Sequence, residues 1–294
     1  MRNVWIGILT VMMLLMACVD EVNDNSQSKV PDKLVLHAFI HPDSQLYVRL
    51  AMVSGVNEPD IWVNDASVFY EDSKGIKTAF KGNNVGEYRL NNPLNPNDSV
   101  RIRIIHAKFN GLLSSKIPNK LVIQKVDTFT TLVSGLGKTK GYRIYFKDSA
   151  YLQNFYQISI WRVYWNYNST LTDSQLLKEK INIGGNEFAF LRNQYNQYAT
   201  KEILFSDEII NGVNNHLEVY ETVPRVKIAS QKTLYYLIEL DNINEGYFDY
   251  INSRNAHIWQ QNSITQLPMQ ISGNISATYG VFGLYTNQAV KISP

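Results

Sequence analysis

The segment Phe155–Tyr167 is the most unusual part of the chain and a candidate for ligand contact, because it combines aromatic rings with polar side chains. If the segment is a β-strand, one side of it presents Gln157, Ser159, Trp161, Val163, Trp165 and Tyr167. Aromatic rings beside polar groups can stack on sugars, but they more often pack sheets together. The other side is also apolar, and such a strand is normally covered on both faces. We predict that the rings serve folding more than recognition, and keep Trp161, Trp165 and Tyr167 as candidate ligand contacts.

A glycine-rich stretch, Gly135-Leu136-Gly137-Lys138-Thr139, has part of the pattern of a phosphate-binding loop. The full pattern needs a glycine five places before Gly137, where Leu132 stands, and a helix after the loop. The residues that follow, Gly141–Phe146, are typical of a strand instead. We therefore predict a hairpin turn here and no phosphate site.

Metal ligands are sparse in the sequence. His37 and His41 are four residues apart, which on a strand separates them by about 13 Å, too far to share one ion. The chain has no His-Glu-x-x-His motif and a single cysteine, so no zinc site is predicted. The loop Asn95–Asp98 offers oxygen atoms that suit calcium, but Asn and Asp are most often turn formers. No metal is predicted, and a calcium-binding loop stays an alternative.

Catalysis and nucleic-acid binding have little support. No Gly-x-Ser-x-Gly motif is present to place a nucleophilic serine. The 28 Lys and Arg residues nearly balance the 26 Asp and Glu residues and form no basic stripe, so no nucleic-acid partner is expected. We predict no catalytic residue, no cofactor and no enzyme activity. A hydrolase whose catalytic groups are spread along the chain stays an alternative.

The N-terminus predicts export and a lipid anchor. Residues 1–17 combine a basic start, a short apolar run and a small residue at the end, as secretory signals do. Leu15-Met16-Ala17-Cys18 resembles a lipobox, in which the cysteine thiol receives the lipid. We predict that Cys18 is acylated, which links the chain to membrane lipid. Residues 18–30 are polar and acidic, so we expect a flexible tether.

The rest of the chain predicts a mostly β protein. In residues 31–120, short strands alternate with turns, and Val100–Ile105 places apolar and basic residues on opposite sides. This region is expected to form an immunoglobulin-like or transthyretin-like β-sandwich. Residues 121–294 are expected to form a second β-rich domain with one or two short helices. Asn244 is the predicted cap of a helix over 245–261, and a shorter helix is predicted over 207–211.

Several of these features resemble one family of outer-membrane lipoproteins. They are the lipobox, the strand at Gly86-Glu87-Tyr88, the segment Phe205–Gly212 and the C-terminal Gly273-Asn274-Ile275…Gly280-Val281-Phe282-Gly283. Together they resemble the family known as domain of unknown function 4249. Physically, Gly280 and Gly283 suit a close backbone approach or a bulge in a strand, which requires no ligand.

The resemblance implies a location and a role. Members of this family commonly lie next to genes for TonB-dependent transporters. It therefore implies an outer-membrane lipoprotein with an accessory role in nutrient uptake, which binds a TonB-dependent transporter or its cargo, with a glycan or a peptide as the candidate cargo. The acidic pair Asp20-Glu21 near Cys18 resembles the surface-export signals of some outer-membrane lipoproteins, which predicts exposure at the cell surface; a solvated linker is the alternative. A surface adhesin or structural lipoprotein is the alternative.

Overall fold

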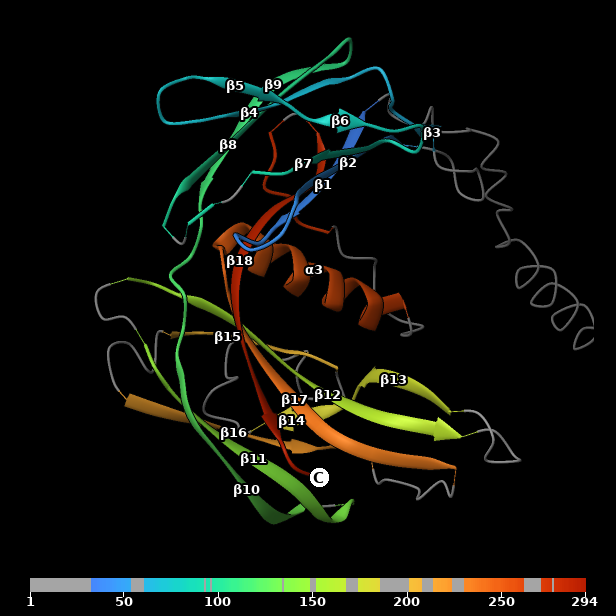
Figure 1. Ribbon diagram of the computed structural model, residues 1–294, viewed down its shortest axis with the longest axis vertical. Helices are drawn as coiled ribbons and strands as arrows, with labels where there is room; N and C mark the ends of the chain where they lie inside the picture. The colour runs from blue at the N-terminus through green and yellow to red at the C-terminus, as the bar shows by residue number, and fades with distance from the viewer. Residues whose placement is uncertain are drawn as a thin grey trace, which may run out of the picture.

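The computed structural model describes residues 33–53, 61–92, 94–95, 97–133, 135–148, 152–167, 174–185, 201–207, 214–223, 230–261, 271–276 and 278–294 (Figure 1). Within these residues the chain is mostly strand with one helix, so the prediction of a mostly β protein is confirmed. The predicted signal segment, Cys18 and the tether at 18–30 lie outside the described residues. So does most of the short helix predicted at 207–211.

The largest sheet has ten strands from both ends of the chain. Eight of them lie in the order β13 (Ser174–Lys180), β12 (Phe155–Tyr167), β17 (Gln231–Ile243), β18 (Tyr279–Ile292), β1 (Leu34–Ile40), β2 (Leu46–Met52), β7 (Glu87–Leu90), β6 (Lys81–Gly82). The other two strands are β15 (Ile203–Ser206), which pairs with β12, and β3 (Ile61–Trp62), which pairs with β2.

Strand β18 makes this sheet continuous. Its first half runs parallel to β1, from the pair Val35–Tyr279 to the pair Ile40–Leu284. Its second half runs antiparallel to β17, from Ile243–Tyr285 to Tyr236–Ile292. The last described strand therefore joins the first described strand to β17 and, through β17, to β12.

Two four-stranded sheets accompany the large one. The first has the order β5 (Lys77–Ala79), β4 (Ser67–Glu71), β8 (Ser99–His106), β9 (Phe109–Lys116). The second has the order β10 (Ile123–Val133), β11 (Gly137–Lys147), β16 (Asn214–Glu221), β14 (Ile183–Gly185). Each of them has a buried face that contributes to a separate hydrophobic core.

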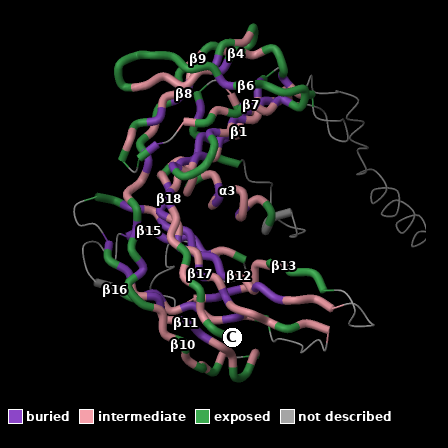
Figure 2. Tube along the Cα trace, in the orientation of Figure 1, coloured by how far each residue is buried: buried purple, intermediate pink, exposed green. Residues whose placement is uncertain are grey.

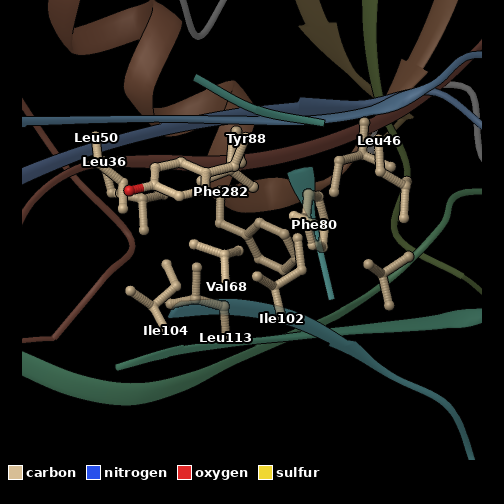
Figure 3. Packing of buried hydrophobic residues seen from close by; sticks show 14 of the residues in the cluster. Leu36, Leu46, Leu50, Val68, Phe80, Tyr88, Ile102, Ile104, Leu113 and Phe282 are labelled. Carbon is tan, nitrogen blue, oxygen red and sulfur yellow. The ribbon is translucent and has the colours of Figure 1, made fainter. Parts of the chain in front are cut away.

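The first core lies between the first small sheet and the strands β1, β2 and β7. In β8 the predicted alternation is confirmed, because Val100, Ile102 and Ile104 are buried. Figure 3 shows Ile102 and Ile104 across the core from Leu36 and Leu50. Each fully buried aliphatic side chain of this kind stabilises the fold by about 1.5–3 kcal/mol.

Most residues of this core fall between positions 34 and 117, but the C-terminal part of the chain also contributes Ile275, Phe282 and Leu284. The first predicted domain therefore packs directly against residues of the second. The boundary at residue 120 and the immunoglobulin-like or transthyretin-like topology stay predictions.

The second core lies between the second small sheet and the strands β12 and β17. Tyr156, Ile158 and Ile160 of β12 point into it, together with Ile144 and Phe146 of β11. Since side chains alternate along a strand, Gln157, Ser159 and Trp161 point to the opposite face of the large sheet. Buried residues follow β12 and β18 through the middle of the molecule (Figure 2).

The helix α3 (Glu245–Gln261) covers this opposite face, between the two halves of the molecule (Figure 1). Tyr247, Phe248 and Ile251 pack against residues of β12, β15, β17 and β18. The predicted helix is confirmed, but Ile258, which helical spacing places on the same apolar face, is 51% exposed.

Asn244 precedes α3, as predicted, yet its side chain does not cap the helix. Its Oδ1 accepts a hydrogen bond from the Leu284 backbone N–H at 3.0 Å, while its main-chain carbonyl accepts from Tyr247 and Phe248. The Asn244 side chain therefore fixes the start of α3 to β18.

Candidate functional site

The candidate aromatic residues lie along β12, and Trp161 is half-buried on the face that α3 covers. Its indole N–H donates to Glu239 Oε2 on β17. The Lys178 ammonium lies 4.1 Å from the ring centroid, and that of Lys180 lies 5.1 Å away. Trp161 is therefore part of a network of charges, and a cation occupies a ring face on which a sugar would stack.

Trp165 and Tyr167 lie farther along β12, where it pairs with Leu176 and Ser174 of β13. Both rings are half-buried. They do not line the pocket between α3 and the large sheet, which Gln157 and Ser159 do line. The prediction that the three rings serve folding more than recognition stays a prediction.

That pocket is a polar cavity of about 230 Å³ between α3 and the large sheet. On its floor, Gln157, Asp241 and Asn287 form a row across β12, β17 and β18, because Gln157 pairs with Asp241 and Asp241 pairs with Asn287. Ser159 pairs with Glu239 in the next row on this face. The remaining lining residues are Lys180, Glu202, Tyr247, Ile251, Arg254 and Tyr285.

Glu202 holds one side of the pocket together. Its Oε2 accepts from Gln157 Nε2 at 2.8 Å and from Lys180 Nζ at 3.1 Å. Its Oε1 accepts from Arg254 Nη2 of α3 at 2.7 Å. Charge-assisted hydrogen bonds of this kind are the stronger ones in proteins. Glu202 therefore ties β12, β13 and α3 into a rigid wall.

The two carboxylates of β17 differ in their partners. Glu239 accepts from Trp161 and forms an ion pair with Lys178 at 3.1 Å. Asp241 makes no hydrogen bond or ion pair with any residue that the structure describes. Burial, and then the negative charge of Glu239, raise the pKa of Asp241 to about 7. Burial also raises the pKa of Tyr247, which faces the same cavity.

A second group of buried polar residues lies beside the second core. Asn154 Nδ2 donates to Asp148 Oδ1 at 3.1 Å and to Asp207 Oδ2 at 3.0 Å, and the Tyr156 hydroxyl donates to Asp148. Burial raises the pKa of Asp207. These groups hold the start of β12 against the end of β15, so we assign them a structural role.

The remaining predicted motifs have structural roles. Gly135 lies in the turn that joins β10 to β11, so the hairpin prediction is confirmed. Asp98 Oδ2 accepts from the Asn95 backbone N–H at 2.8 Å, which confirms a turn in that loop. His37 lies within β1 and His41 directly follows it.

One sequence signal for the pocket lies in β17, and a search for known motifs misses it. In Tyr235–Ile243, Glu239 and Asp241 are two residues apart within an apolar strand, which places both carboxylates on one face. Charges at such positions are rarely buried without a reason. Glu202 and Arg254 carry no comparable signal, because only the fold brings them to this face.

These features define a mostly β protein of several sheets with a charged pocket between a helix and the largest sheet. A family model described as "Domain of unknown function (DUF4249)" matches residues 19–290. The chain belongs to this family, and the resemblance drawn from its motifs is confirmed.

Other comparisons add little. No curated protein matches the chain. Among solved structures, the chain is similar to a DUF4785 family protein from Legionella pneumophila, with 8% sequence identity and a TM-score of 0.23. The match covers 70% of this chain and 52% of that one, so this chain spans about half of that protein's length. Across the described ranges, no helix is both long and apolar enough to cross a membrane.

Proposed function

We propose that the protein is a lipid-anchored, non-enzymatic binding protein of the outer membrane that assists a TonB-dependent transporter in nutrient uptake. Cys18 is the proposed site of lipidation. Membership of the DUF4249 family supports the link to a transporter, since members commonly lie next to transporter genes. The observation that carries the binding role is the polar cavity of about 230 Å³ between α3 and the large sheet.

The construction of this cavity favours recognition of a small molecule. Apart from Glu202, which directly precedes β15, its lining residues come from strands and a helix, which hold polar groups more accurately than loops do. Glu202 is fixed by donors from three segments, so the wall exists before a ligand arrives. A preorganised site loses less entropy on binding, which increases affinity.

A crosslinking pull-down from intact outer membranes tests the proposed role. The full-length protein should capture a TonB-dependent transporter, and Cys18→Ala should leave the membrane fraction and lose that partner. Binding to host or matrix surfaces without a transporter would favour the adhesin alternative. Turnover of sugars or peptides by the purified protein would favour a hydrolase.

A further inference from the structure

The pocket contains polar groups that have no partner among the described residues. Asp241 makes no hydrogen bond or ion pair there, in contrast to the paired Glu202 and Glu239. Ser159 is 2% exposed and lines the cavity, yet its hydroxyl has no hydrogen bond within the same set of residues. Asp241 is half-buried and Ser159 is buried, and buried polar groups in folded proteins are nearly always hydrogen-bonded. We infer that a bound molecule completes these interactions.

The charges around Asp241 select the sign of that molecule. Glu239 and Glu202 both act to raise the pKa of Asp241, and Lys180 opposes them. An anion would therefore meet the Asp241 carboxylate, which no described cation pairs, because Lys180 and Arg254 are held by Glu202 and Lys178 is held by Glu239. A neutral molecule would leave the Asp241 carboxylate unpaired. A cation compensates both the lost hydration and the repulsion between the carboxylates.

The aromatic residues and the size of the cavity restrict the cation further. The rings of Tyr247 and Tyr285 lie 6.1 Å apart at the pocket wall, and tyrosine ring faces attract cations. Within the described ranges, no three His, Cys, Asp or Glu side chains converge to hold a metal ion. The volume of about 230 Å³ is below the roughly 300–1,000 Å³ of sites for drug-sized ligands.

We propose that this pocket binds a compact organic cation with a primary ammonium group, which pairs with the Asp241 carboxylate. An ammonium has three donors and no acceptor. Asp241 takes one N–H, and the hydroxyl oxygens of Ser159 and of Tyr247 or Tyr285 take the others. This inference rests on the proposed binding function and names the class of its cargo.

Isothermal titration calorimetry of the purified full chain at pH 8 tests the proposal. The probes are putrescine and ethanolamine, with 1,4-butanediol and succinate as neutral and anionic analogues of putrescine. We expect at least one amine to bind, and neither analogue. Asp241→Asn should weaken amine binding by at least about tenfold, which is about 1.4 kcal/mol. Asp249→Asn, a matched change on the exposed side of α3, should leave binding unchanged.

The pH dependence supplies a second readout. Ionised Asp241 binds the ammonium, so affinity should fall about tenfold between pH 8 and pH 6, as the carboxyl protonates. Asp241→Asn should remove this dependence. The other titratable or charged groups that face this carboxyl are Glu239, Lys180, Glu202, Arg254, Tyr247 and Tyr285.

Either of two results would overturn the proposal. One is the failure of both amines to bind the wild-type protein at pH 8. The other is equal amine binding by the wild type and by an Asp241→Asn variant whose circular dichroism spectrum is native. The variant Ser159→Ala tests the same site independently. The transporter pull-down on the same proteins separates the two hypotheses. Capture of a transporter without amine binding refutes the ligand class and leaves the accessory role in place.

Discussion

Replacing Gly280 by alanine tests how the two ends of the chain are joined. Gly280 has φ +117°, and an added Cβ would lie 1.8 Å from the backbone oxygen of Leu36 on the parallel strand β1. A backbone strained in this way costs about 1–3 kcal/mol with a side chain present. Moving β1 away from β18 would also break about two ladder hydrogen bonds, each worth about 0.5–1.5 kcal/mol.

The expected loss for Gly280→Ala is therefore about 2–6 kcal/mol, out of a typical total of about 5–15 kcal/mol. Urea unfolding followed by circular dichroism measures it. Gly135→Ala is the matched control, since Gly135 has φ +79° but an added Cβ meets no atom within 4 Å. It should cost only the strain, about 1–2 kcal/mol. Equal losses in the two variants would refute the close approach of β18 to β1.

Three further predictions concern the anchor, the pocket and the aromatic strand. Cys18→Ala should abolish acyl labelling and release the protein from membranes; unchanged labelling would contradict the lipobox. Folding raises the pKa of Asp241 from 3.8 to about 7. The folded protein should therefore lose stability as the pH rises through this range, and the loss should be complete above it. Asp241→Asn should flatten that part of the stability curve, measured by urea unfolding. Ile160 is fully buried, so Ile160→Ala should lower the free energy of unfolding by about 2–5 kcal/mol. Trp161→Ala should cost less, because the Trp161 ring is half-buried. The opposite order in melting experiments would show that the Trp161 side is the true core.

Strands with a regular apolar pattern could be predicted from the sequence. The segment predicted at 155–167 agrees with β12, and the alternating segment predicted at 100–105 lies within β8. In both strands the burial of one face depends on residues two apart, so the information is local.

Strands that depend on a neighbour could not be predicted in this way. The sequence of β13 is polar and mostly exposed, and the strand exists because it pairs with the edge of β12. The tendency of a segment like β13 to form a strand is set by its tertiary context more than by its own residues. The parallel pairing of β1 with β18 joins residues 244 positions apart, such as Val35 and Tyr279, and no local pattern encodes it.

The pocket was also beyond local patterns, although part of it was visible. The alternation in β12 correctly placed Gln157 and Ser159 on one face, but the aromatic rings mark the other end of the strand. The groups opposite them come from a loop residue, Glu202, and from Arg254 of α3. Their meeting depends on how α3 lies over the sheet, which the helical periodicity alone does not specify.

Asp241 is the strongest argument that this face was shaped by binding. The difference between its usual pKa of 3.8 and about 7 corresponds to about 4 kcal/mol of lost stability at neutral pH. A structural role would require a partner, as Glu202 has in joining α3 to the sheet, and Asp241 has none within the described residues. Groups that lower stability in this way gather at functional sites. An asparagine here would fold more readily, so the carboxylate is best explained by a positively charged ligand.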